Sequence, residues 1–152
     1  MTDEELIARV KLIEEQSSCL SRHVGCVISD KDKILGYGVN GAPITSTPCN
    51  KIGFCTRKIV RQDCKSGEHL DLCRAVHAEE NAILDMLMNN NEQYINADNL
   101  IMYVSAVPCD RCAKLICNTK IDTVIALEDY NNYRTKAIFE ENGITLKLVN
   151  KR

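Results

Sequence analysis

The spacing of apolar residues changes several times along the chain, and each spacing predicts a different element. Leu6, Val10 and Ile13 recur at helical intervals, and they follow Thr2 and Glu5, which form the capping-box pattern of a helix start. The first element is therefore predicted to be a helix that ends at the first pair of serines.

Two short apolar runs come next, over residues 24–29 and 34–39, and the residues between them are all charged. This pattern predicts a hairpin of two strands. From residue 40 to residue 67 no periodicity is visible, which predicts a long irregular loop. A loop of that length inside a compact domain is usually functional or held in place by something.

The second half of the chain alternates between strand-like and helix-like spacing. Strands are predicted over residues 100–104, 123–127 and 144–149, and helices over residues 75–88, from Pro108 onward and over residues 135–142. In the first of these helices, Ile83, Leu84 and Leu87 are expected on the buried side. The asparagines at positions 89–91 are expected to end it.

This order of elements predicts an α/β fold with three layers, in which a five-stranded mixed sheet carries helices on both faces. A length of 152 residues is typical of one domain, and no linker, internal repeat or low-complexity tract divides the sequence. We therefore expect residues 1–152 to form a single domain.

Composition and charge argue against several classes of protein. Nineteen basic and twenty-one acidic residues give a net charge of −2, which disfavours a general nucleic-acid binder but allows a local cationic pocket for a small anion. The apolar runs are far shorter than the roughly 20 residues that span a bilayer, and the first residues lack a signal-peptide pattern. We expect a cytoplasmic protein with neither a nucleic-acid partner nor a membrane partner.

Nine cysteines are many for a protein expected to be cytoplasmic. In a reducing compartment they indicate metal ligands or catalytic thiols before disulfides. Cys26 and Cys117 lie on apolar faces of predicted elements, so we expect these two to be packing residues.

Two short segments, each at the start of a predicted helix, carry the chemistry. Cys109 and Cys112 are three residues apart, so both sulfurs can face one ion. His77 and Glu79 are two apart and can share a site only at the beginning of a helix. One histidine and two thiolates leave tetrahedral zinc an open position for water, as in catalytic sites, and Glu79 could then transfer protons.

Each motif alone has a simpler interpretation. A C-x-x-C pair is often half of a structural zinc site or a redox pair, and His-x-Glu at a helix start is often only a capping pattern. Together, in this order and about thirty residues apart, they match the zinc deaminase signature, H-x-E followed by P-C-x-x-C.

Further segments extend this match over most of the chain. They include G-V-N-G-A-P at residues 38–43, C-R-A-V-H-A-E-E-N-A-I at residues 73–83 and P-C-D-R-C-A-K at residues 108–114. In these segments the chain resembles the deoxycytidylate (dCMP) deaminase family, which has the cytidine-deaminase-like fold. The resemblance implies that His77, Cys109 and Cys112 bind catalytic zinc, that Glu79 shuttles protons and that Asn40 lines the nucleotide site.

The activity implied by the resemblance is hydrolytic deamination of dCMP to dUMP and ammonia, which feeds thymidylate synthesis. The resemblance also implies a homohexamer, activation by dCTP, with Mg²⁺ accompanying the nucleotide effector, and inhibition by dTTP. Val39 stands where the family commonly has tyrosine, and this departure bears on the regulation by nucleotides.

Some members of the family carry a second, structural zinc, with ligands at positions resembling Cys19 and Cys49. With Cys55 and Cys73 these thiols could form a closed four-thiolate site that holds the long loop. Cys64 and His69 are reserve ligands. The alternative is that these thiols are unrelated.

The predicted substrate contacts are Asn40, Ala78, Ser105 and Tyr130; the last follows a strand at the carboxyl end of the sheet, where such folds bind ligands. A phosphate would need fixed donors. The candidates next to the motifs are Arg22, Arg74, Arg111 and Lys114, each of which has the alternative interpretation of an ordinary surface residue.

Three other functions stay open at this point. The chain could deaminate another cytosine compound, such as dCTP, a nucleoside or the free base. A tRNA adenosine deaminase is disfavoured by a pI near 5.9. The chain could also be a zinc-stabilised binding module without catalysis, in which the cysteine-rich loop is the functional part.

Overall fold

The structure is a computed structural model, and it describes residues 1–60, 62–65, 68–130 and 132–149. Positions 61 and 66–67 of the predicted loop, and positions 131 and 150–152 of the predicted domain, lie outside the described residues. The elements in chain order are α1 (Asp3–Glu14), β1 (Gly25–Ser29), β2 (Ile34–Val39), α2 (Cys49–Ile52), α3 (Thr56–Val60), η1 (Leu70–Leu72), α4 (Ala78–Asn89), α5 (Asn91–Asn96), β3 (Leu100–Ala106), α6 (Asp110–Cys117), β4 (Ile121–Glu128), α7 (Tyr133–Glu141) and β5 (Thr145–Leu148).

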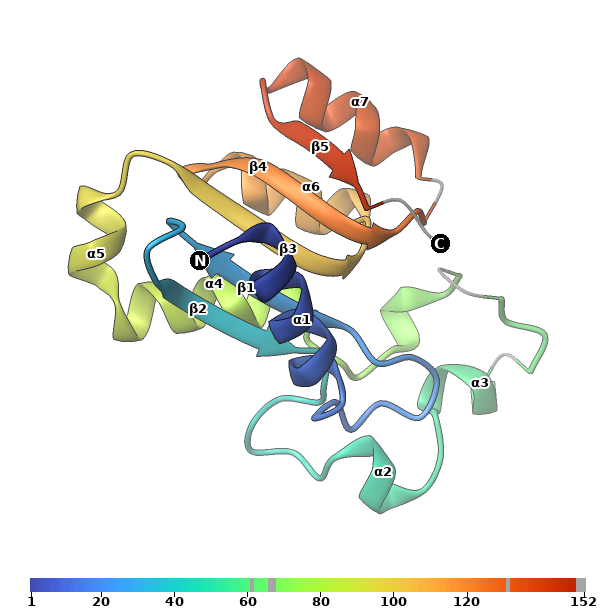
Figure 1. The fold of residues 1–152 in the computed structure, drawn as a ribbon. Helices are drawn as coiled ribbons and strands as arrows, with labels where there is room; N and C mark the ends of the chain where they lie inside the picture. The colour runs from blue at the N-terminus through green and yellow to red at the C-terminus, as the bar shows by residue number, and fades with distance from the viewer. Residues whose placement is uncertain (61, 66–67, 131, 150–152) are drawn as a thin grey trace.

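The strands form one mixed sheet in the order β2-β1-β3-β4-β5. β1 is antiparallel to both β2 and β3, whereas β3, β4 and β5 run parallel. The predicted α/β fold with a five-stranded mixed sheet is confirmed (Figure 1).

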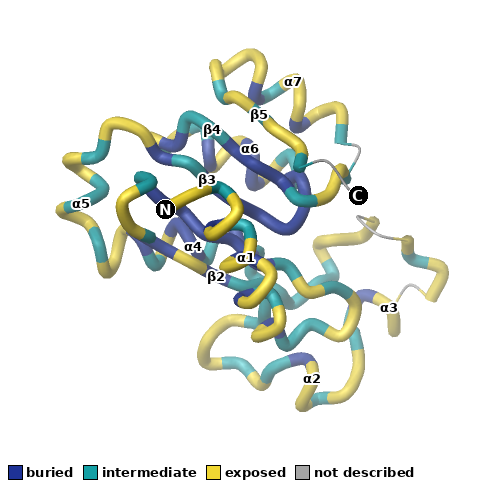
Figure 2. The backbone as a smooth tube through the Cα atoms, viewed as in Figure 1, coloured by how far each residue is buried: buried dark blue, intermediate teal, exposed yellow. Residues whose placement is uncertain are grey.

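Alternating side chains of the central strands fill two cores, one on each face of the sheet. Val27, Tyr103 and Ile125 pack against the apolar side of α1. Their neighbours along the same strands face the opposite way and pack with α4, α6 and α7 in a larger core. β1 and β3 are therefore buried along most of their length, and β4 in its middle (Figure 2).

The predicted loop from residue 40 is more ordered than its sequence indicates. It contains α2 and α3, and η1 follows before α4 begins. This segment lies beyond the end of the sheet where β2 stops and α4 starts (Figure 1). Helices of four and five residues are too short to produce a detectable period, which is why the apolar spacing missed them.

The expected buried side of α4 was partly wrong. Ile83 is buried, but Leu84 and Leu87 are exposed, because the helix instead turns Ala78, Ala82 and Met86 toward the sheet. A further short helix, α5, begins right after the asparagines that were expected to end α4.

α4 packs directly against the backbone of β2, and two glycines allow this close approach. A Cβ added to Gly38 would lie 2.6 Å from the Ala82 backbone nitrogen and 2.8 Å from the Ala78 oxygen. A Cβ added to Gly36 would collide with Ala82 and Met86. The helix and strand could not keep this spacing with any larger residue at either position.

Gly38→Ala is expected to lower the free energy of unfolding by about 1–3 kcal/mol, because the new methyl group meets helix backbone that cannot move alone. Urea denaturation measures the loss. Gly41→Ala is the matched control, since its Cβ would meet only the Ser18 hydroxyl at 3.3 Å. Equal stability of the two variants would contradict this interpretation of the packing.

The outer edge of β2 is covered by polar side chains from α4 and the residue that follows it. β2 is an edge strand, so the backbone groups at alternate residues point away from β1. Three of these groups are bonded, namely Val39 O to Asn81 Nδ2 (2.8 Å), Tyr37 N–H to Asp85 Oδ2 (3.0 Å) and Leu35 O to Asn90 Nδ2 (2.7 Å). These three groups are therefore bonded to side chains and do not offer a template for another strand.

In the part of the chain that the structure describes, no helix is both long and apolar enough to cross a bilayer.

Candidate functional site

His77 is placed by the segment that leads into α4. A short antiparallel bridge joins Val76 to Gly41 through bonds of 2.7 and 3.1 Å between their backbones. His77 itself is the N-cap of α4 and has extended backbone angles, and its N–H donates to the Glu80 carboxylate at 3.0 Å. The imidazole thus projects from the beginning of the helix, as the His-x-Glu spacing predicts.

Cys109 and Cys112 are placed by the turn between β3 and α6. Cys109 is the N-cap of α6, and its sulfur accepts a bond from the backbone N–H of Cys112 at 3.5 Å. The Thr135 hydroxyl on α7 donates to the Pro108 carbonyl at 2.7 Å and fixes the entry to this turn. Both thiols therefore sit on the first turn of a helix anchored by its neighbour.

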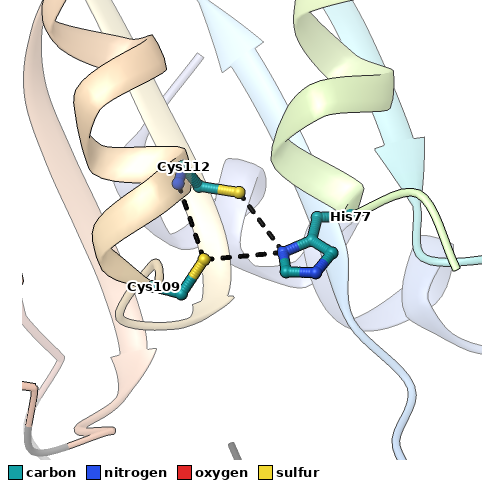
Figure 3. A group of neighbouring side chains, drawn as sticks. All are labelled: His77, Cys109 and Cys112. Carbon is teal, nitrogen blue, oxygen red and sulfur yellow. Dashed lines mark hydrogen bonds between the residues drawn. The ribbon is translucent and has the colours of Figure 1, made fainter. Parts of the chain in front are cut away.

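These residues converge between the beginnings of two helices (Figure 3). His77 Nδ1 lies 3.3 Å from Cys112 Sγ and 3.6 Å from Cys109 Sγ. Nitrogen and sulfur ligands around tetrahedral zinc are separated by about 3.5 Å, given their usual bond lengths. All three ligand atoms lie within 4.8 Å of one another, so the group fits a zinc ion both in spacing and in donor chemistry.

The thiols and the imidazole influence each other's protonation. Hydrogen bonds from Cys112 and from His77 lower the pKa of the Cys109 thiol to about 4, despite burial. The pKa of Cys112 is raised because it donates to Cys109 and because it is buried. The hydrogen bond with Cys109 raises the pKa of His77. The lowered pKa of Cys109 favours its thiolate, and a thiolate is the form of cysteine that zinc binds.

Glu79 lies in the first turn of α4 and is only 5% exposed. Burial raises the pKa of its carboxyl group, while bonds with its own backbone N–H and with Cys112 oppose that rise. The carboxylate is thus next to a candidate metal ligand, and a raised pKa suits a group that must both accept and release a proton.

A cavity of about 390 Å³ opens beside this group. His77, Ala78, Glu79 and Cys109 line it from the two helix starts. Its volume is within the range of pockets that hold small organic ligands. The site therefore combines candidate metal ligands, a buried acid and room for a small molecule.

Asn40 lines the same cavity, its contact with a nucleotide stays a prediction, and its side chain also organises the surrounding backbone. Its Oδ1 accepts from the Val24 N–H at 2.9 Å and from the Ser17 hydroxyl at 2.6 Å, and its Nδ2 donates to the Arg22 carbonyl at 2.8 Å. These bonds use one of the two N–H donors of the amide. Asn40 is thus held rigidly at the cavity wall.

Tyr130 also lines the cavity, and the Arg22 guanidinium lies over its ring at 4.9 Å from the centroid. Arg22 contacts Glu128 as well, at 3.9 Å. Ala78 and Tyr130 are therefore where a bound ligand could touch them, and their contact with a substrate stays a prediction.

Ser105 is not among the residues that line the cavity. Its hydroxyl accepts from the Gly25 N–H at 2.8 Å and donates to the Glu14 carboxylate at 2.6 Å. It joins β3 to β1 and to the end of α1. The geometry gives Ser105 a role in holding these elements together, and nothing in it supports the predicted substrate contact.

Of the arginines and lysines singled out in the sequence, the structure brings only Arg22 to the cavity. Arg74 donates to the Thr47 carbonyl at 2.8 Å and to Cys49 Sγ at 3.8 Å, which fixes the loop, and Arg111 and Lys114 are exposed on α6. Sequence reasoning missed Arg57 and Lys58 on α3, both of which line the cavity. A basic pair inside the cysteine-rich loop was the only available signal.

The four thiols expected to hold a second metal ion are not brought together as one set. Cys19, Cys55 and Cys73 line the cavity, but Cys49 is buried under Arg74 and does not. The reserve ligand Cys64 lines the cavity too and donates to the Glu68 carbonyl at 3.1 Å. Among the described residues, only His77, Cys109 and Cys112 form a group with metal-ligand spacing. As expected, Cys26 is buried in the core and Cys117 packs against it.

The chain is similar in sequence to known proteins. A family model of the cytidine and deoxycytidylate deaminase zinc-binding region matches residues 1–128. The chain is 32% identical over 146 residues to a deoxycytidylate deaminase of Schizosaccharomyces pombe, which covers 95% of this chain and 43% of that protein. The chain thus spans less than half the length of this relative.

A shorter relative, the deoxycytidylate deaminase of Mycobacterium phage D29, is 30% identical over 131 residues, or 81% of this chain and 91% of that protein. Among solved structures, the dCMP deaminase of the cyanophage S-TIM5 in complex with dCMP and dUMP is similar, with a TM-score of 0.74. It is 20% identical and covers 98% of this chain and 99% of that chain. This likeness supports the fold.

Proposed function

Because the chain belongs to the cytidine and deoxycytidylate deaminase zinc-binding family, we propose that it catalyses hydrolytic deamination of dCMP to dUMP and ammonia. One observation carries the proposal: His77, Cys109 and Cys112 lie at metal-ligand spacing beside the buried carboxyl group of Glu79, at the wall of a cavity. The substrate is proposed from the similar proteins of Schizosaccharomyces pombe and Mycobacterium phage D29, which are deoxycytidylate deaminases.

A zinc ion held by His77, Cys109 and Cys112 would act as a Lewis acid that makes water a stronger nucleophile near neutral pH. The chain's own residues supply the remaining chemistry. Glu79 accepts a proton from the attacking water and delivers it to N3 of the cytosine ring, and it then takes the remaining proton from the hydroxyl formed at C4 and gives it to the departing amine. Water adds its oxygen at C4, the C4–N bond breaks and ammonia leaves, so the reaction needs no other co-reactant.

The structure indicates how the chain prepares this step. The buried position of Glu79 excludes competing water from its carboxylate, and its place on the first turn of α4 keeps it close to Cys112. Asn40, fixed by three hydrogen bonds, provides an immobile polar contact for the nucleotide. Because such a site is already rigid, little of the binding energy of the substrate is lost in ordering the residues of the site.

The finer points implied by the family resemblance are also proposals. They are cytoplasmic activity in thymidylate supply, assembly as a homohexamer, activation by dCTP with Mg²⁺ and inhibition by dTTP. Because Val39 stands where the family commonly has tyrosine, the response to dCTP and dTTP is the property to test first.

The test is formation of dUMP from dCMP by zinc-loaded protein, followed by chromatography, with and without dCTP and Mg²⁺. Cytosine, cytidine, deoxycytidine and dCTP are assayed in parallel. We expect dUMP and ammonia in equal amounts, and dCMP as the preferred substrate. Preference for another cytosine compound would move the proposal to that substrate, whereas no turnover of any by zinc-replete protein would favour a non-catalytic module.

A further inference from the structure

One charged side chain inside the loop lacks the partners that its burial requires. Arg57 on α3 is 8% exposed, and its Nε is buried without a hydrogen-bond partner. Among the described residues it is the only buried side-chain nitrogen or oxygen in this condition. Such a group costs free energy unless something else satisfies it.

The rest of the guanidinium is only partly engaged. Its Nη1 donates to the Glu68 carbonyl at 3.2 Å, and no carboxylate forms an ion pair with it in the described part of the chain. Cys73 does not supply the missing negative charge, because burial raises the pKa of that thiol. In the described part of the chain, the buried guanidinium thus has one carbonyl as a hydrogen-bond acceptor and no carboxylate counter-ion.

Arg57 lies in the wall of the cavity that also contains the candidate active site. Lys58, the next residue on α3, lines the same cavity, and so does Arg22, which is paired with Glu128 of the same lining. The lining therefore combines candidate metal ligands and a buried acid from the starts of two helices with basic side chains from a separate segment of the chain. Such a lining suits a ligand that carries both an uncharged reacting group and an anionic group.

Resting on the proposed function, we propose that the guanidinium of Arg57 binds the 5′-phosphate of the pyrimidine nucleotide and so sets the preference for a nucleoside monophosphate over the free nucleoside. A guanidinium presents several N–H donors in a fixed fork, which matches the oxygens of a phosphate. The phosphate would supply the counter-ion and the acceptors that Arg57 lacks.

The test compares Arg57→Gln with wild type on dCMP and on deoxycytidine. The ratio of kcat/KM for dCMP to kcat/KM for deoxycytidine is expected to fall on the order of 100-fold, since bonds to a charged group are worth about one to two factors of ten each. Arg57→Lys should keep part of the ratio, because it keeps the charge but not the fork.

The matched control is Arg74→Gln, which removes an arginine of the same loop that bonds Thr47 outside the cavity lining. It should keep the wild-type ratio. If Arg57→Gln lowers both activities equally, or leaves the ratio at its wild-type value, Arg57 does not bind the phosphate and the inference is wrong.

Measurements of ligand binding test the inference about Arg57 independently of the proposed function. By calorimetry, wild type should bind dUMP more tightly than deoxyuridine, and Arg57→Gln should bind the two alike. Wild type that deaminates no cytosine compound but shows this difference would contradict the proposed function and keep the phosphate site. If wild type deaminates dCMP, but wild type and Arg57→Gln prefer dUMP over deoxyuridine to the same degree, the proposed function is supported and the phosphate site is wrong.

Discussion

Glu79→Gln is expected to lower kcat for dCMP by at least about 100-fold while the zinc content stays at the wild-type value. The amide cannot exchange a proton at working pH, and general acid–base groups contribute on the order of 10²–10⁴-fold. Glu79 is outside the group of candidate ligands, so the metal should remain bound. Steady-state kinetics and metal analysis by atomic emission measure the two quantities on the same sample.

Glu80→Gln is the matched control, one residue further along the same helix turn. Its carboxylate only accepts the His77 N–H, and an amide oxygen can accept the same bond, so kcat should fall by less than about tenfold. If Glu79→Gln kept more than about a hundredth of wild-type turnover, or if both variants lost activity equally, Glu79 would not be the proton shuttle.

Removing the metal is the second change with a large expected effect. A chelator should abolish deamination, added zinc should restore it, and Cys112→Ser should remove one zinc per chain together with the activity. Zinc binds the thiolate, and a serine hydroxyl does not ionise under the same conditions. Metal content and turnover are measured before chelation, after it and after zinc is returned.

Cys117→Ser is the control for this prediction, because Cys117 is on the same helix but packs against the core. It should keep wild-type metal content. Zinc should also raise the melting temperature of wild type but not of Cys112→Ser, since a ligand that binds only the folded state stabilises it. Full activity in a metal-free protein would refute the assignment of these ligands.

The sequence identifies the candidate metal site well because the chemistry depends on spacing along the chain. Cys109 and Cys112 must lie on one helix turn, and His77 must precede α4, so each requirement leaves a local signature. The strands are also visible in the sequence, although only the range 34–39 has the bounds of its strand, β2, and the others differ at their ends. Patterns of this kind can be recognised in the sequence because residues close together along the chain determine them.

What the sequence does not reveal depends on distant contacts. Arg57 looks like a surface residue of a polar loop until folding buries it beside η1. Ser105 looks well placed for a substrate, yet it faces Glu14 of α1. Asn90 was interpreted as a helix stop, and the structure shows that it also bonds the backbone of β2. The partner lies 11 residues away for Arg57, 91 for Ser105 and 55 for Asn90.

The bonds that cover the outer edge of β2 come largely from the same helix that begins at a candidate metal ligand. Asn81 and Asp85 belong to α4, whose N-cap is His77, so the helix that presents a ligand also shields the sheet. Another chain could add a strand there only after α4 had moved away and released these bonds. Detachment of α4 from β2 would therefore open this edge of the sheet to cross-β pairing with another chain.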